Sequence, residues 1–108
     1  MDLGLNGKVA LVTAASLGLG KAIAIEFAKE GSMISISARG EDQLYRTRDE
    51  LAALGAEVLA IRADASKADG VRRTVDETVR RFGRIDILVN NAGEAWVGHS
   101  VDTTDQDW

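Results

Sequence analysis

The feature that most constrains the fold is an alternation of two hydrophobic periodicities along the chain. Short apolar runs, typical of buried strands, alternate with segments whose apolar residues recur every three or four positions, as in amphipathic helices. The predicted strands are Lys8–Thr13, Ser32–Ala38, Glu57–Arg62 and Ile85–Val89, and the predicted helices are Gly20–Lys29, Glu41–Leu54 and Ala68–Phe82. This β-α-β-α-β-α-β order predicts an α/β fold with a doubly wound parallel sheet and helices on both faces.

Each predicted helix carries an apolar stripe that we expect to be buried against the sheet. The stripes consist of Ile23 and Phe27 in the first helix, Leu44, Leu51 and Leu54 in the second, and Val71, Val75, Val79 and Phe82 in the third. Gly31 and Gly55 stand just beyond the first two helices, where a left-handed C-cap would lie.

The composition limits the classes of function that the chain can serve. The 108 residues contain no cysteine, and their formal net charge is −4. The length corresponds to one small domain. Without cysteine, a disulfide scaffold and a thiolate metal site are excluded, and a cytoplasmic location is expected. The acidic balance argues against a nucleic-acid partner, and no apolar run is long enough to cross a membrane.

Small, polar or charged residues follow all four predicted strands. In a parallel sheet the carboxyl ends of the strands meet at one edge, where ligands bind. The segments at this edge are Thr13–Gly20 (TAASLGLG), Arg39-Gly40, Asp64-Ala65-Ser66 and Asn90-Asn91-Ala92-Gly93. A glycine-rich turn into a helix offers free backbone N–H groups and the positive end of a helix dipole, which suit a phosphate. The missing side chains would therefore leave room for a pyrophosphate.

Each of these segments also has a purely structural interpretation. The glycine pair could form a tight turn, Asp64-Ala65-Ser66 an N-cap for the third helix, and Asn90-Asn91 an Asx-turn. Arg39 could be a solvated charge at the start of a loop. We favour a ligand site because four separate loops carry such residues at the same edge.

Motifs for other enzyme chemistries are absent from the sequence. His99 is the only histidine, so a metal cluster would need carboxylates alone. Neither Gly-x-Ser-x-Gly nor Gly-Lys-Ser/Thr occurs, which argues against a hydrolase elbow and a P-loop. No metal site is predicted.

The sequence resembles the short-chain dehydrogenase/reductase family in three motifs. The family's cofactor motif, Thr-Gly-x-x-x-Gly-x-Gly, corresponds to Thr13-Ala14-Ala15-Ser16-Leu17-Gly18-Leu19-Gly20. Its Asn-Asn-Ala-Gly motif is intact at Asn90–Gly93, and its acidic residue after the third strand corresponds to Asp64. The resemblance runs from about Lys8 to the last residue. Ala14 replaces the motif's first glycine, and we expect it to be tolerated with a negative φ.

The resemblance implies a Rossmann-like dinucleotide site. Gly18 and Leu19 would present backbone to the pyrophosphate, with Ser16 and Leu17 near the adenosine ribose. Asp64 would meet the adenine, and the turn that follows the fourth strand would contact the adenosine half of the cofactor. The implied cofactor-binding residues are Thr13, Ala14, Ser16, Leu17, Gly18, Leu19, Gly20, Arg39, Asp64, Ala65, Asn90, Asn91, Ala92 and Gly93.

The end of the second predicted strand favours NADP over NAD. NAD recognition usually places an Asp or Glu there, which accepts a hydrogen bond from the ribose 2′-hydroxyl. This chain has Ala38 followed by Arg39. A guanidinium binds a 2′-phosphate that a carboxylate would repel. Leu17 stands at the family's other common basic position, which weakens the preference, so NAD stays the less favoured alternative.

The resemblance implies an NADP(H)-dependent oxidoreductase that transfers hydride between the nicotinamide and a small-molecule carbonyl or alcohol substrate. The alternatives are a non-catalytic dinucleotide-binding or interaction module and an inactive truncated product. The family's catalytic Ser, Tyr and Lys are not expected in this chain. Its one tyrosine, Tyr45, lies before the expected position and is followed four residues later by Asp49 instead of a lysine.

Residues 1–108 are expected to be the N-terminal part of a single NAD(P)-binding domain. Thr104 and Asp107 match a capping box, so the sequence stops at Trp108 where a fourth helix would begin. The resemblance implies further strands and a homo-oligomer for the complete protein. Without a fifth strand, Ile85–Val89 would be an exposed apolar edge, and the chain alone would not be a stable monomer.

Overall fold

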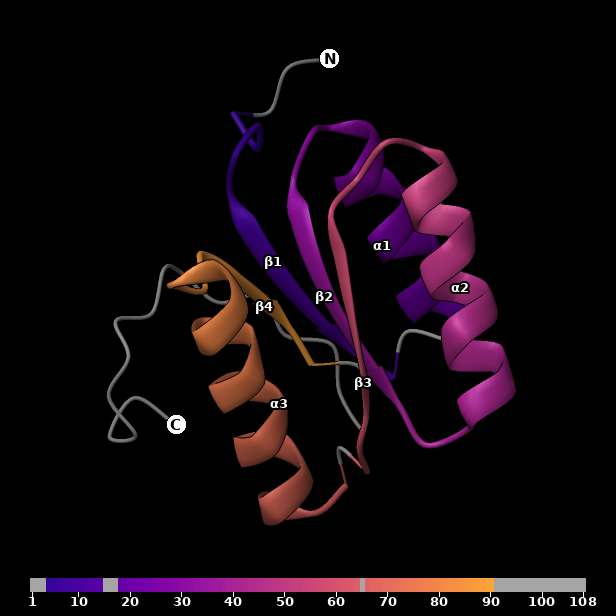
Figure 1. The fold of residues 1–108 in the computed structure, drawn as a ribbon, viewed down its shortest axis with the longest axis vertical. Helices are drawn as coiled ribbons and strands as arrows, with labels where there is room; N and C mark the ends of the chain where they lie inside the picture. The colour runs from indigo at the N-terminus through magenta and orange to yellow at the C-terminus, as the bar shows by residue number, and fades with distance from the viewer. Residues whose placement is uncertain (1–3, 15–17, 65, 91–108) are drawn as a thin grey trace.

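The computed structural model describes residues 4–14, 18–64 and 66–90, which form a parallel sheet of four strands with three helices (Figure 1). The strands are β1 (Val9–Thr13), β2 (Met33–Ala38), β3 (Val58–Arg62) and β4 (Ile87–Val89), and the helices are α1 (Gly18–Lys29), α2 (Glu41–Ala53) and α3 (Ala68–Phe82). The predicted element order and Rossmann-like α/β class are therefore confirmed.

Strand β1 is central because it pairs with β2 on one side and with β4 on the other. The sheet order is β3-β2-β1-β4, with Thr13 opposite Ser37 and Ala38 opposite Arg62 at the strand ends. All pairs are parallel, so the carboxyl ends of the strands share one edge, which is the lower edge in Figure 1.

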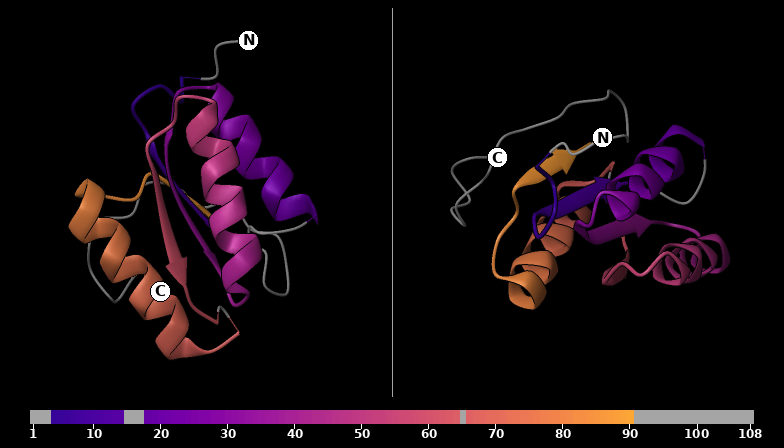
Figure 2. Two further views of the ribbon diagram at one scale, coloured as in Figure 1. Left: turned by 45° about the vertical axis from the view of Figure 1, so that its right-hand side comes forward. Right: turned by 90° about the horizontal axis from the view of Figure 1, so that it is seen from above.

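Helices α1 and α2 cover one face of the sheet and α3 covers the other, as Figure 2 shows. The larger core lies on the α1–α2 side and contains the fully buried Val12, Ile34 and Leu44. The smaller core lies on the α3 side and contains Leu11 and Leu88. Successive residues of β1 therefore face opposite cores, which explains why the whole strand is buried.

Two observed elements, α1 and β4, begin at other residues than predicted, and one predicted core residue is exposed. Helix α1 begins at Gly18 instead of Gly20, so the glycine motif contributes its first turn. Strand β4 begins at Ile87 instead of Ile85, although Ile85 is buried in the smaller core. Leu54 was expected in the buried stripe of α2, and this is wrong: it is the C-cap residue and is 47% exposed.

Helix α3 packs on the sheet through hydroxyl groups as well as through its valines. Val75 and Val79 are half-buried, whereas Thr74 and Thr78 are fully buried. The Ser35 and Thr78 hydroxyl oxygens lie 2.6 Å apart, and the Thr78 hydroxyl donates to the Thr74 carbonyl oxygen at 2.7 Å.

Within the described residues, no helix is long and apolar enough to span a bilayer.

Candidate dinucleotide site

The carboxyl edge of the sheet brings together the residues that follow the four strands. Ala14 follows β1, Arg39 follows β2, and Asn90 follows β4 directly, while Asp64 stands two positions beyond β3. The predicted site residues Ser16, Leu17, Ala65, Asn91, Ala92 and Gly93 lie outside the described part of the chain.

Thr13 links the ends of β1 and β4. Its side chain is buried, and its hydroxyl donates to Asn90 Oδ1 at 3.1 Å, with the Val89 carbonyl oxygen 3.4 Å away. Thr13 is the first residue of the glycine motif and Asn90 is the first residue of the Asn-Asn-Ala-Gly motif. The contact therefore fixes the starting points of the two motifs beside each other.

Ala14 adopts a left-handed backbone conformation, with a φ of +52°. The expectation that this alanine keeps a negative φ is wrong. A Cβ atom in the left-handed region costs about 1–2 kcal/mol relative to ordinary backbone, so glycine is normally preferred there. The chain thus makes the turn of the motif without its usual glycine.

The N-terminus of α1 presents open backbone at this edge. A Cβ atom built on Gly18 would have no atom within 4 Å, and the φ of Gly18 is +61°. The first turn of α1 contains no acidic residue. Gly20 is buried, while the Leu19 side chain is 60% exposed. Backbone N–H groups and the helix dipole are therefore available to an anion at this turn.

Asp64 makes contacts with both of its carboxylate oxygens. Oδ1 accepts hydrogen bonds from the Ser66 backbone N–H at 2.9 Å and from the Ser66 hydroxyl at 2.6 Å. Oδ2 lies 3.9 Å from Nη1 of Arg39, whose side chain is 78% exposed. The Ser66 hydroxyl, the Ser66 N–H and the positive charges of Arg39 and Lys67 together lower the pKa of Asp64 below its ordinary value of 3.8. Asp64 is therefore ionised at neutral pH.

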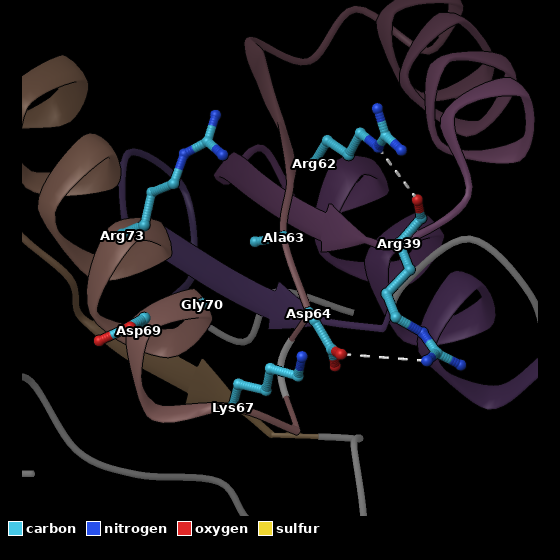
Figure 3. Close-up of a pocket in the computed structure, with 8 residues that line it drawn as sticks. All are labelled: Arg39, Arg62, Ala63, Asp64, Lys67, Asp69, Gly70 and Arg73. Carbon is cyan, nitrogen blue, oxygen red and sulfur yellow. Dashed lines mark hydrogen bonds and ion pairs between the residues drawn. The ribbon is translucent and has the colours of Figure 1, made fainter.

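The N-cap interpretation of Asp64 and Ser66 is wrong. The N-cap residue of α3 is Lys67, whose side chain makes no capping hydrogen bond. Asp64 instead closes a local turn onto Ser66, which leaves its second carboxylate oxygen directed at Arg39 (Figure 3).

A cavity of about 520 Å³ opens between the carboxyl end of β3 and the start of α3 (Figure 3). Its lining residues are Arg39, Arg62, Ala63, Asp64, Lys67, Asp69, Gly70 and Arg73. Arg39 and Asp64 were predicted from the sequence as site residues, whereas the cations Arg62, Lys67 and Arg73 and the acidic Asp69 were not. Arg62 is the last residue of β3, and Lys67 is the N-cap residue of α3.

Gly70 allows α3 to approach the backbone of Asp64. A Cβ atom on Gly70 would overlap the carbonyl oxygen of Asp64 and would lie 2.8 Å from its carbonyl carbon. Sequence analysis missed this residue too. A glycine inside a predicted helix costs about 1 kcal/mol relative to alanine, so its presence in Ala68–Phe82 was a usable signal of close packing.

Comparison with known proteins identifies the family. The short chain dehydrogenase family model matches residues 8–108. A curated relative, 11-beta-hydroxysteroid dehydrogenase A of Sesamum indicum, is 47% identical over 81% of this chain and 25% of its own length. The chain thus spans about a quarter of that relative.

Solved structures agree with this assignment. The hydroxysteroid dehydrogenase of Escherichia coli superposes with a TM-score of 0.78 and 38% identity, over 83% of this chain and 38% of that one. A short-chain dehydrogenase/reductase of Burkholderia phymatum in complex with NAD gives a TM-score of 0.75 and 37% identity, over 78% and 30% of the two chains. The chain belongs to the short-chain dehydrogenase/reductase family of oxidoreductases.

Proposed function

We propose that the complete protein is an NADP(H)-dependent oxidoreductase that transfers hydride between the nicotinamide and a carbonyl or alcohol substrate. In this proposal, residues 1–108 are the N-terminal part of one NAD(P)-binding domain. They supply the surface that holds the adenosine and pyrophosphate portions of the cofactor.

The turn between β1 and α1 would hold the pyrophosphate. Space beside Gly18 is open, and no acidic residue in the first turn of α1 opposes an anion. The helix dipole and the free N–H groups of that turn stabilise a phosphate by charge and by hydrogen bonds. The residues present at this turn therefore fit the dinucleotide.

The observation that carries the NADP preference is the pair Ala38-Arg39 at the end of β2. Ala38 is buried and brings no carboxylate to the place where a ribose 2′-hydroxyl would be recognised. Arg39 follows it with an exposed guanidinium, whose one ion pair among the described residues is the 3.9 Å contact with Asp64. A guanidinium can form two parallel hydrogen bonds to a phosphate, so an exposed Arg39 at this place suits a 2′-phosphate.

The described residues bind and orient the cofactor and take no part in proton transfer. The nicotinamide supplies or accepts the hydride when the cofactor is bound. Tyr45 is a poor candidate for the proton donor because it packs against the larger core from α2. Its ring stacks under the guanidinium of Arg48 at 4.7 Å, and no lysine follows it at the required spacing. We therefore propose that the catalytic Ser, Tyr and Lys belong to another part of the protein.

Two alternatives are separated from this proposal by turnover. A non-catalytic binding module, or an inactive truncated product, would bind NADPH and leave it unoxidised with every substrate. The relatives named as hydroxysteroid dehydrogenases make oxo- and hydroxysteroids the first substrates to test. Oxidation of NADPH by the complete protein with an oxosteroid or another ketone would exclude the non-catalytic module for that protein. Turnover by the 108-residue chain alone would exclude the inactive truncated product.

The cofactor preference is tested by replacing Arg39 in the complete protein. The Arg39→Ala variant is expected to bind NADPH about 10- to 100-fold more weakly, because charge-assisted hydrogen bonds to the 2′-phosphate are lost. Its affinity for NADH, which lacks that phosphate, is expected to stay within about twofold. Dissociation constants from titration of cofactor fluorescence provide the measurement.

The matched control is Arg46→Ala, which removes an exposed arginine from α2 that does not line the cavity. This variant is expected to bind both cofactors like the unmodified protein. An unchanged NADPH-to-NADH selectivity in Arg39→Ala would contradict the NADP assignment.

A further inference from the structure

The turn that carries Arg39 is short and lacks a side-chain cap. It joins β2 to α2 through Arg39 and Gly40 alone. Gly40 is the N-cap residue of α2 and makes no side-chain capping hydrogen bond. The exposed Arg39 guanidinium lies 3.9 Å from the Asp64 carboxylate, and an ion pair of this kind contributes little in solvent. Contacts from outside the turn are therefore needed to set the direction in which Arg39 leaves β2.

Arg62, at the end of β3, makes such contacts on both sides of Gly40. Its Nε donates to the Arg39 carbonyl oxygen at 3.4 Å, and its Nη1 lies 3.9 Å from Oε2 of Glu41, the first residue of α2. Figure 3 shows Arg62 reaching the main chain of Arg39, while the Arg39 side chain extends in another direction, toward Asp64. One guanidinium thus contacts the turn at the residue before Gly40 and at the residue after it.

The pairing of β2 with β3 gives the Arg62 side chain a fixed base. Ala38 stands opposite Arg62 in the register of the two strands. Just beyond that pair, the Ala63 N–H donates to the Ala38 carbonyl oxygen at 3.0 Å. The planar guanidinium holds its donors at fixed angles to one another, so it can define the geometry of the groups that it contacts. The end of β3 can therefore determine the path of the chain beyond Ala38.

We propose that Arg62 is a positioning residue for cofactor selection, which holds the turn after β2 so that Arg39 reaches the 2′-phosphate of NADP(H). This inference rests on the proposed NADP(H) function and adds a part for β3. Holding the turn in advance reduces the entropy that is lost when Arg39 is ordered on the phosphate. The charge of Arg62 is offset by that of Glu41, so its effect comes from geometry and needs no contact with the phosphate.

The test compares Arg62→Met with Arg73→Met in the complete protein. Arg62→Met removes both contacts with the turn, and we expect it to weaken NADPH binding about threefold, as for loss of exposed polar contacts. NADH binding should be unchanged, because NADH has no 2′-phosphate for Arg39 to reach. Arg73→Met removes a cation that lines the same cavity but pairs with Glu77, and it should change neither affinity.

Two further variants separate positioning from a direct effect of charge. In an Arg39→Ala background, Arg62→Met should cause no further loss of NADPH affinity, because its contribution passes through Arg39. A further loss there would show that Arg62 acts on the phosphate itself and would overturn the inference. Arg62→Lys keeps the charge without the planar fork and should behave like Arg62→Met. Full NADPH affinity in Arg62→Lys would equally overturn a positioning role.

Calorimetric titration with 2′,5′-ADP and with 5′-AMP gives a readout that is independent of turnover. Arg62→Met should weaken 2′,5′-ADP binding about threefold and leave 5′-AMP binding unchanged. Equal losses for both nucleotides would indicate a general distortion of the site, and they would overturn the inference, as would no loss for either. If Arg39→Ala alters selectivity and Arg62→Met does not, the proposed function stands without this inference; if Arg39→Ala does not alter it, the NADP preference itself fails.

Discussion

Ala14 shows how a single residue can depart from a family motif and keep its geometry. The turn after β1 needs a left-handed residue, and Ala14 supplies it at a φ of +52°. Four positions later Gly18 supplies a second left-handed residue at a φ of +61°. The motif is therefore preserved as a backbone conformation, and the cost of the alanine Cβ atom is stored at this turn.

The Ala14→Gly substitution is expected to stabilise the fold by about 0.5–1 kcal/mol, because relief of left-handed strain exceeds the added entropy of the unfolded chain. Urea unfolding of the complete protein measures the change. Ala52→Gly is the matched control, since Ala52 is exposed in helix α2 and its replacement should destabilise the fold by about 1 kcal/mol. Equal destabilisation by both substitutions would show that Ala14 is unstrained.

Asp64 makes the stability of the fold depend on pH. Its folded-state pKa lies below 3.8, first because of the Ser66 hydroxyl and N–H and then because of Arg39 and Lys67. Ionised Asp64 therefore stabilises the fold fully at pH values above its unfolded-state pKa. This stabilisation is lost as the pH falls through the lower folded-state pKa.

Removal of the Ser66 hydroxyl is expected to raise the pKa of Asp64 toward its ordinary value and to reduce the acid sensitivity of the fold. The Asp64 carboxyl carbon can be titrated by NMR in the unmodified protein and in Ser66→Ala. Arg39→Ala should raise the same pKa by a smaller amount, since the Arg39 charge is a lesser cause than the Ser66 hydrogen bonds. An identical Asp64 pKa in Ser66→Ala would refute this account.

At the scale of elements, α3 determines how the cavity is formed. Its first turn approaches the backbone of Asp64 at Gly70, and the Thr74 hydroxyl donates to the Gly70 carbonyl oxygen at 2.7 Å. Further along, Thr78 meets Ser35 of β2 through a buried contact between hydroxyl groups. A polar seam thus sets the position of the helix, and the valines at its sides remain half-buried.

The Gly70→Ala substitution is expected to destabilise the fold by about 1–3 kcal/mol, because the new methyl group forces α3 away from Asp64. Thermal or urea unfolding measures this loss. Gly40→Ala is the control, since a Cβ atom on Gly40 has no atom within 4 Å and its φ is −84°. Similar small effects of both substitutions would mean that α3 is free to shift.

The valine stripe of α3 illustrates what periodicity can and cannot predict. It identified the helix Ala68–Phe82 with both boundaries correct. It did not identify Thr74 and Thr78 as the buried contacts, because threonine reads as polar unless a hydroxyl partner such as Ser35 is known. The prediction that Leu54 is buried was wrong for the opposite reason. Leu54 is apolar and follows the helical spacing, but it lies beyond the end of α2.

For the whole molecule, the parallel sheet with helices on both faces followed from the alternation of strands and helices. Parallel pairing then required the four strand ends to meet at one edge, so Arg39 and Asp64 could be assigned to a common site before any contact was known. Arg62 and Lys67 could not be assigned to it. Their positions depend on how closely α3 packs against β3, which the spacing of residues in the sequence does not determine.

Strand β4 lies at an edge of the sheet, which affects whether this part of the protein stays monomeric. Among the described residues, β4 pairs with β1 alone and leaves its other edge open. An apolar strand with an unpaired edge is prone to association. We therefore expect residues 1–108 alone not to form a stable monomer, and the homo-oligomer of the complete protein stays a prediction.

The most direct test of the central claim is a crystal structure of the complete protein with bound NADPH. We expect electron density for the pyrophosphate at the N-terminus of α1 beside Gly18. We expect the 2′-phosphate within hydrogen-bonding distance of the Arg39 guanidinium. A dinucleotide bound away from the carboxyl edge of the sheet, or one whose 2′-phosphate makes no contact with Arg39, would contradict the account.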